Sequence, residues 1–233
     1  MKENFSALVE EIRSNISKIR IKGKTARRKS DGSPVTDADL FLDRLIFRWC
    51  QANLAEFQYF SEENPLTDTI DDRVALVVVD PLDGTENFVS GLPIWGISVA
   101  IFHPDGGSDA LLYFPDLNLE LTKQSVISPL ISRVYGLSSS LTSLDISQRL
   151  DDSYEYRILG SCAFNLYASI TGSFSGFENM KKANTWDIAG GMILAHHFGL
   201  EVILDGKPYD GSRISLFEPH KFKVTNIMAH KQV

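Results

Sequence analysis

Two stretches near the start of the chain carry apolar residues at helical spacing. The first begins at Phe5 and predicts an amphipathic helix from the apolar positions Leu8, Val9, Ile12, Ile16 and Ile19. The second begins where Thr36 precedes Asp37, Ala38 and Asp39, the pattern of an N-cap followed by acids in the first turn. Its apolar face, from Phe41 to Cys50, predicts a helix that runs to about Ala55.

A continuous apolar run predicts a strand at the centre of a sheet. Val74–Val79 reads VALVVV, as expected of a strand buried on both faces, and it stops at the acids that begin with Asp80. Further strands are predicted at 97–102, 110–114 and 201–204, and helices at 163–171 and 187–198. The mixture predicts an α/β (α+β) fold in which helices are layered on sheets.

Composition limits the size of the fold and the kinds of partner. The 233 residues, 43% of them hydrophobic, suffice for one sizeable core or two tightly joined lobes. The formal net charge of -7 argues against a nucleic-acid polymer or an anionic membrane as partner. The local exception is a basic run, interpreted as a solvated loop or as an attractor of an anionic ligand: Lys22, Lys24, Arg27, Arg28 and Lys29.

No run of apolar residues reaches the length of a membrane span, and the first residues are acidic where a secretory signal would be apolar. We therefore expect a cytoplasmic protein. Cys50 and Cys162 are far apart and lack the spacing of a zinc site, so two reduced thiols are expected. Three consecutive serines at 138–140 predict a loop.

The segment that follows the apolar strand carries the most chemical information. It reads Asp80-Pro81-Leu82-Asp83-Gly84-Thr85. Carboxylates at the end of a buried strand are costly without a counter-charge, and Mg²⁺ is a usual one. The Leu82 carbonyl offers another oxygen, and the N–H groups of Gly84 and Thr85 suit a phosphate oxygen. Two alternatives are an ordinary Asp-Gly turn and a phosphatase of the haloacid-dehalogenase type, although the latter spaces its acids D-x-D rather than D-x-x-D.

Other acids are candidates for the same site. Glu62 and Glu63 follow a short apolar segment, Asp39 lies in the first turn of the second helix, and Asp187 follows Trp186 at a helix start. Each alone has a structural interpretation, as an exposed loop residue or as an acid that complements a helix dipole. Together they offer four or five carboxylates that a fold could bring to one metal cluster.

Four motifs follow one another along the chain: Asp31–Asp39 (DGSPVTDAD), Glu62-Glu63, Asp80–Thr85 (DPLDGT) and Trp186–Gly191 (WDIAGG). In combination they resemble the inositol monophosphatase family of Mg²⁺-dependent, lithium-sensitive phosphatases. The resemblance implies a sugar-phosphatase-like αβαβα sandwich. We expect a lobe at 1–115 that carries most metal ligands and a C-terminal lobe at 116–233 that closes the site. The second lobe is predicted to be shortened, because a hairpin usual in the family is missing after Pro115.

The resemblance also implies roles for individual residues. The metal ligands for two or three Mg²⁺ ions would be Glu62, Asp80, the carbonyl of Leu82, Asp83 and Asp187. Asp39 and Thr85, with Glu62, would form the catalytic set, the first two polarising the attacking water. The phosphate and the rest of the substrate would lie against Gly84, Thr85, Gly160, Ser161 and Asp187. Cys162 is expected to be a buried inert thiol rather than a nucleophile. A homodimer is implied as well.

The expected activity is hydrolysis of a small soluble phosphate ester by metal-activated water. Inositol-specific members carry a Glu at the position of Met180, and Glu178 is out of register with it. Residues 177–187 and 205–209 look more like the branch that acts on 3'-phosphoadenosine 5'-phosphate, whereas residues 87–96 resemble inositol- and histidinol-phosphate phosphatases. The competing hypothesis is a regulatory protein that binds metal or ligand on the same fold without turnover; retention of Asp39 and Thr85 argues against it.

Overall fold

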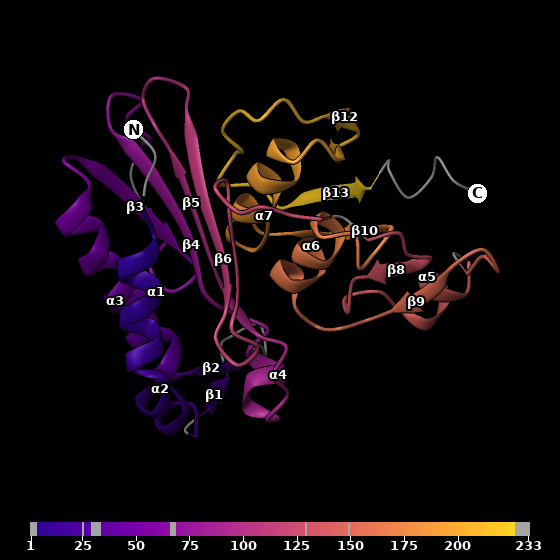
Figure 1. Cartoon of the computed structure of the whole chain (residues 1–233), viewed down its shortest axis with the longest axis horizontal. Coiled ribbons are helices and arrows are strands. Elements are labelled where there is room, and N and C mark those ends of the chain that lie inside the picture. The colour runs from indigo at the N-terminus through magenta and orange to yellow at the C-terminus, as the bar shows by residue number, and fades with distance from the viewer. Residues whose placement is uncertain are drawn as a thin grey trace.

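The computed structural model describes residues 4–24, 26–28, 34–65, 69–128, 130–148 and 150–226. Lys29 and the residues Asp31–Ser33 of the first motif lie outside the described residues. Two sheets organise the rest of the chain (Figure 1). A third, two-stranded sheet pairs β1 (Ala26–Arg28) with β2 (Pro34–Thr36), so the middle of the predicted basic loop is a short strand with exposed side chains.

The first sheet has five strands in the order β3-β4-β5-β6-β7, antiparallel except for the parallel pair β3 and β4. Its strands are β3 (Phe57–Ser61), β4 (Ala75–Asp83), β5 (Gly96–Phe102), β6 (Ser108–Phe114) and β7 (Leu119–Thr122). The helix α4 (Thr85–Val89) follows β4. β4 begins close to the predicted place but continues to Asp83, so the acids at its end belong to the strand itself.

The N-terminal helices cover one face of this sheet (Figure 1). The predicted first helix is two, α1 (Ser6–Ser14) and α2 (Ile16–Lys22), interrupted at Asn15, whose side-chain amide donates to the Glu11 carbonyl at 2.8 Å. Four of the predicted apolar positions, Leu8, Val9, Ile12 and Ile19, are buried and Ile16 is half-buried, because the interruption is only one residue long. The helix α3 (Asp37–Asn53) confirms the second prediction, including its capping box between Thr36 and Asp39.

The second sheet has six strands in the order β12-β11-β13-β10-β8-β9. They are β8 (Val134–Leu137), β9 (Glu155–Arg157), β10 (Gly176–Ala183), β11 (Glu201–Leu204), β12 (Lys207–Pro208) and β13 (His220–Thr225). The helices of this half are α5 (Ser143–Ser147), α6 (Cys162–Ile170) and α7 (Thr185–His197). α6 and α7 lie between the two sheets, which gives the layered α/β arrangement expected from the sequence (Figure 1).

The central strand β4 joins two hydrophobic cores. Leu76 and Val78 pack into the core that α6 and α7 share with both sheets, and Val77 and Val79 pack into the core under α1–α3. Alternate side chains of a strand point to opposite faces, so a strand between two cores must be apolar throughout. Burying each of these side chains contributes roughly 1.5–3 kcal/mol.

The division of the chain between the sheets falls a little beyond residue 115. β7 pairs with β6, so the first sheet extends to Thr122, and the second begins at Val134. α7 packs on β4, β5 and β6 as well as on β11, so it links both sheets. Within the described part of the chain, no helix combines the length and apolar character needed to cross a membrane.

Candidate functional site

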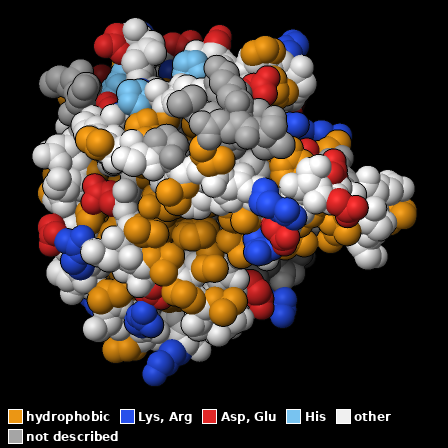
Figure 2. All heavy atoms as spheres, turned by 45° about the vertical axis from the view of Figure 1, so that its right-hand side comes forward, with side chains coloured by type: hydrophobic (Ala, Val, Ile, Leu, Met, Phe, Trp, Pro, Cys, Tyr) orange, Lys and Arg blue, Asp and Glu red, His pale blue; other side chains and the backbone are white. Residues whose placement is uncertain are grey.

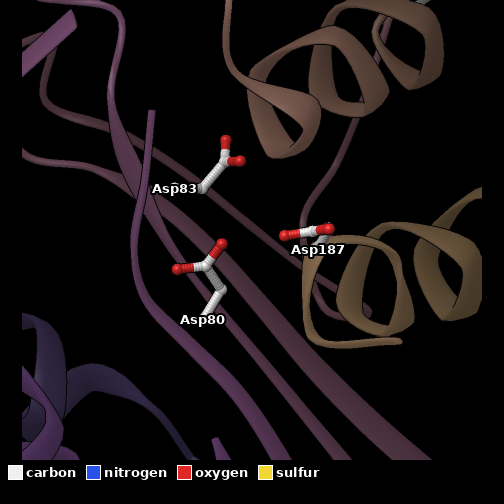
Figure 3. A group of neighbouring side chains, drawn as sticks. All are labelled: Asp80, Asp83 and Asp187. Atoms are coloured by element: carbon white, nitrogen blue, oxygen red, sulfur yellow. The ribbon is translucent and has the colours of Figure 1, made fainter. Parts of the chain in front are cut away.

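Three carboxylates from distant parts of the sequence meet at the end of β4. Asp80 and Asp83 lie on that strand and Asp187 lies in the first turn of α7; each offers an oxygen, and these oxygens lie within 4.8 Å of one another. Figure 3 shows the three side chains turned toward a common space between the strand and the helix. Asp80 and Asp83 are buried. The convergence suggested by the sequence therefore exists for three of the acids.

A bulge in β4 puts both strand acids on one side. In a regular strand, residues three apart point to opposite faces. Here Asp80 pairs with Ser98 and Asp83 with Gly96, so three steps along β4 match two along β5, and the extra residue turns Asp83 back toward Asp80. Pro81, which has no N–H to lose from a ladder, lies inside this irregularity.

The electrostatics of this cluster favour a cation. Burial raises the pKa of Asp80 well above its ordinary value, and the charges of Glu62, Asp83 and Asp187 raise it further. Burial also raises the pKa of Asp83 to about 6, although hydrogen bonds from Ser161, Ala163 and Cys162 work against the rise. Like charges gathered in a buried place repel one another, and a divalent cation bound by oxygen ligands removes that cost. The donors, all oxygen atoms, fit Mg²⁺ or Ca²⁺ rather than a metal that prefers nitrogen or sulfur.

Glu62 and Leu82 lie at the margin of the cluster. The Glu62 backbone N–H donates to the Val79 carbonyl at 3.2 Å, which places this residue beside the end of β4. Its charge acts on both Asp80 and Asp83. The Leu82 carbonyl accepts a hydrogen bond from the Thr85 hydroxyl at 3.1 Å.

Asp39 and Thr85 approach each other from the starts of α3 and α4. The Thr85 hydroxyl lies 3.4 Å from Asp39 Oδ1, while Asp39 Oδ2 accepts from the backbone N–H and the hydroxyl of Thr36 at 2.8 and 2.6 Å. Burial raises the pKa of Asp39 to about 6; the hydrogen bonds from Thr36 lower it and the charge of Glu63 adds to the rise. The pair predicted to polarise water thus has a carboxylate whose pKa is close to neutral pH.

The start of α6 closes the site from the second half of the chain. Asp83 accepts hydrogen bonds from the Ser161 hydroxyl and from the N–H groups of Cys162 and Ala163, the latter two at 3.1 and 2.9 Å. Gly84 lies against this helix in the left-handed conformation at φ 84°, and a Cβ there would lie 3.2 Å from the Ser161 Cβ. Both the conformation and the close approach require glycine.

A cavity of about 230 Å³ adjoins the carboxylates. Besides the predicted Gly160, Ser161, Asp83 and Asp187, it is lined by residues that sequence reasoning missed: Ser138, Ser139, Ser140, Asn165, Asn179 and Lys182. The three serines form a turn after β8, and Asn179 and Lys182 lie on β10; none carries a motif, so only the topology reveals them. Lys182 has φ 87°, at the irregular end of β10.

Two residues singled out in the sequence lie elsewhere. Glu178 lines a separate cavity, with Tyr135, Tyr154 and Lys223 among its neighbours, and Met180 is exposed. Burial, together with the charges of Asp83, Asp187 and Asp80, raises the pKa of the Cys162 thiol well above its ordinary value. A thiol held protonated in this way is a poor nucleophile. Cys162 is half-buried rather than buried as predicted, because it lines the cavity.

Comparison with known proteins decides the family. Residues 2–126 match the model of the inositol monophosphatase family. The chain belongs to this family, which is a family of phosphatases. It is 24% identical to "Inositol monophosphatase 3" of Solanum lycopersicum over 76% of each chain, and 29% identical to "Putative Nus factor SuhB" of Neisseria meningitidis over 58% of this chain and 59% of the relative.

Solved structures support the fold. The model superposes with a TM-score of 0.79 on an IMPase/NADP phosphatase complexed with Mg²⁺ and phosphate, covering 97% of this chain and 90% of the other at 21% identity. The layered fold expected from the family resemblance is confirmed. At this identity the likeness concerns the fold, so the roles of individual residues remain predictions.

Proposed function

We propose that this protein is a Mg²⁺-dependent phosphomonoesterase that hydrolyses a small phosphorylated metabolite. The observation that carries the proposal is the meeting of Asp80, Asp83 and Asp187 within 4.8 Å, beside a polar cavity. Membership of a phosphatase family and the Mg²⁺ and phosphate bound by a protein of the same fold support it.

The metal ligands in this proposal are Asp80, Asp83 and Asp187, with Glu62 and the Leu82 carbonyl at the margin of the cluster. Two or three Mg²⁺ ions, when bound, would lower the pKa of water and neutralise charge on the phosphate. The protein's own contribution is to fix the positions of these carboxylates through hydrogen bonds. Asp83 is fixed by three donors from α6, and Asp80 Oδ1 accepts the Leu82 N–H at 3.0 Å.

Asp39 and Thr85 are proposed to take the proton of the attacking water. The Thr85 hydroxyl faces two acceptors, Asp39 Oδ1 and the Leu82 carbonyl, so it can pass its own proton to Asp39 as it accepts one from water. A pKa of Asp39 near 6 suits a proton acceptor at neutral pH, because general bases work best when their pKa lies near the operating pH. Thr36 fixes the carboxylate through its other oxygen.

The substrate is proposed to lie between the end of β4 and the start of α6. The N–H groups of Gly84 and Thr85 would hold phosphate oxygens, and the cavity lined by Gly160 and Ser161 would hold the remainder of the ester. Hydroxyl and amide groups from Ser138, Asn165 and Asn179 dominate the rest of the lining, which favours a hydroxyl-rich group over an apolar one. Inositol monophosphate and 3'-phosphoadenosine 5'-phosphate are the substrates to try first.

Phosphate release tests this function directly. The panel contains these two esters, histidinol phosphate, fructose 1,6-bisphosphate and NADP, each with Mg²⁺, with EDTA and with added Li⁺. We expect release from at least one ester that requires Mg²⁺ and is lost in the Asp83→Asn variant. No release by folded, Mg²⁺-loaded protein would favour the non-catalytic alternative on the same fold, and full activity of Asp83→Asn would contradict the site.

A further inference from the structure

Asp187 depends on the first turn of α7 for its position. Its Oδ2 accepts the Asn184 backbone N–H at 2.8 Å, and its own N–H donates to the Asn184 carbonyl at 3.2 Å. The carboxylate is therefore fixed relative to its helix. Asp80 and Asp83 belong to β4 and not to α7, so further contacts must hold the start of α7 in place relative to the sheets.

The carbonyl of Ser215 holds this helix start. The hydroxyl of Thr185, the first residue of α7, donates to it at 2.5 Å, and Thr185 is only 1% exposed. Ser215 lies in an irregular segment between β12 and β13, where no sheet partner orients its carbonyl. Its neighbours Ile214 and Leu216 are buried in the core, and the groups that bond to its carbonyl act on the orientation of that carbonyl directly.

The second group that bonds to this carbonyl is a buried histidine. His220 Nε2 lies 2.8 Å from the Ser215 oxygen, and His220 Nδ1 lies 2.6 Å from Asp205 Oδ2. Each ring nitrogen faces an oxygen acceptor, so the ring links the Asp205 carboxylate to the Ser215 carbonyl. The Lys221 N–H donates to the other Asp205 oxygen at 2.9 Å, which fixes the carboxylate on the turn after β11.

The arrangement is a continuous set of hydrogen bonds from Asp205 through His220 and Ser215 to Thr185. Burial works to raise the pKa of Asp205, but the hydrogen bonds from His220 and Lys221 outweigh burial and hold it below its ordinary value. Asp205 thus remains an acceptor for the His220 ring. His220 lies on β13, between β11 and β10 in the second sheet, and is only 4% exposed.

We propose that His220 and Thr185 are positioning residues for the metal site: through the Ser215 carbonyl they set where α7 begins, and so where Asp187 meets Asp80 and Asp83. This inference rests on the proposed metal-binding role of Asp187. Groups that orient a metal ligand typically affect metal affinity by about 10–100-fold. Neither residue touches the reacting atoms.

Mg²⁺ titration by isothermal calorimetry, without substrate, tests the proposal on the full-length protein. Thr185→Val keeps the shape of the side chain but removes the hydroxyl, and we expect it to weaken Mg²⁺ binding by about tenfold or more. Thr185→Ser keeps the hydroxyl and should bind within about twofold of the parent. His220→Phe should weaken binding as Thr185→Val does, and His220→Gln, with one donor left, should lose less.

Combining Thr185→Val with His220→Phe should weaken binding no more than the stronger single change, because both act through one carbonyl. At saturating Mg²⁺ we expect kcat of Thr185→Val to recover. Thr171→Val is the matched control: it removes a hydroxyl that donates to the Tyr167 carbonyl at 3.0 Å, at the far end of α6. Circular dichroism melting confirms that each variant is folded, and His220→Gln replaces His220→Phe if the latter unfolds.

The outcomes distinguish failure of the positioning role from failure of the proposed metal site. If Asp187→Asn loses Mg²⁺ affinity while Thr185→Val and His220→Phe bind as the parent does, the positioning role is wrong and the metal site stands. If Thr171→Val weakens binding as much as Thr185→Val, the effect is general loosening and the positioning role is again wrong. If Asp187→Asn itself binds Mg²⁺ normally, the proposed function fails first.

Discussion

Asp39 illustrates how one residue serves both a helix and the candidate chemistry. Its Oδ2 completes the capping box of α3 with Thr36, and its Oδ1 faces Thr85. The capping bonds fix the carboxylate without using the oxygen that points at the site. A residue chosen only to cap a helix would gain nothing from burial to 1% exposure, because burial raises the energy of its ionised form.

Asp39→Asn is expected to separate catalysis from metal binding. The amide can still accept from Thr36 but cannot take a proton, so kcat should fall by roughly 10²–10⁴-fold while the Mg²⁺ dissociation constant stays within about twofold. Steady-state kinetics and calorimetric titration give the two quantities. Asp37→Asn, in the same helical turn but exposed beside Arg27, is the control and should leave both unchanged. An unaltered kcat in Asp39→Asn would remove Asp39 from the proton path.

The raised pKa values predict how stability depends on pH when no metal is bound. Asp39 and Asp83 have pKa values of about 6 in the folded protein, above the ordinary 3.8 that applies to the unfolded chain. Between these values the folded state binds more protons than the unfolded state, so the free energy of unfolding rises as pH falls from 7 toward 4. Thermal melts in EDTA should show this increase. Added Mg²⁺ should weaken or reverse this increase, because Mg²⁺ binds the ionised carboxylates. A melting temperature in EDTA that falls between pH 7 and pH 5 would contradict the prediction.

At the scale of elements, the bulge in β4 and the packing of α7 matter most. The bulge turns Asp83 toward Asp80, and α7 lies close enough to the sheet that a Cβ at Gly190 would come 3.3 Å from the Val99 carbonyl. Close packing brings the first turn of α7, and hence Asp187, to the end of β4. The next residue, Gly191, packs as closely against α6, since a Cβ there would come 2.3 Å from Leu166 Cδ1.

The turn after α6 holds the segment that connects the two sheets. Gly172 has φ 81°, a Cβ on it would lie 2.2 Å from the Leu130 carbonyl oxygen, and the Leu130 N–H donates to Thr171 at 3.1 Å. Gly172→Ala should therefore suffer both from the left-handed conformation and from a collision with backbone. We expect a loss of about 2–4 kcal/mol in the free energy of unfolding.

Gly199→Ala is the matched control for this prediction. Gly199 has φ 77° after α7, but nothing lies within 4 Å of its added Cβ, so only the conformational cost of about 1–2 kcal/mol applies. Urea denaturation measures both variants. Equal losses would mean that the connecting segment moves aside without cost, and that its contact with the end of α6 contributes little.

At the scale of the whole molecule, charge is distributed rather than concentrated on the face seen in Figure 2. Basic and acidic side chains are interspersed there around apolar ones, with no continuous basic stripe. The sequence as a whole carries a formal net charge of -7. The acids that matter for the proposed function lie inside the molecule, between its two halves.

Mg²⁺ is expected to stabilise the whole fold, since its ligands come from β4 and α7. At a concentration 100 times the dissociation constant, a ligand that binds only the folded state adds about 2.7 kcal/mol. For a chain of this size that corresponds to a rise of roughly 5–10 °C in Tm. Differential scanning calorimetry with MgCl₂ against matched NaCl measures it. Asp187→Asn should lose most of the rise, and an equal rise in that variant would place the bound ion elsewhere.

Local patterns predicted the elements that make most of the cores and some of the site. The capping pattern at Thr36 and the apolar run before Asp80 each identified an element with its approximate bounds, because helix caps and buried strands depend on neighbouring residues. The pattern of apolar residues did not predict short strands such as β1 and β9, because they carry few apolar residues and are stabilised by their partners in the sheet.

The amino-acid sequence alone determined which acids were available and, through the family resemblance, that Asp80, Asp83 and Asp187 belong together. The tertiary structure decided how they meet: a one-residue bulge aligned the first two, and the packing of α7 placed the third. It also revealed the serines at 138–140 in the cavity wall and the bonds from His220 to Thr185. These contacts join residues tens of positions apart, and no local pattern encodes them, because their energy comes from partners that only folding brings within reach.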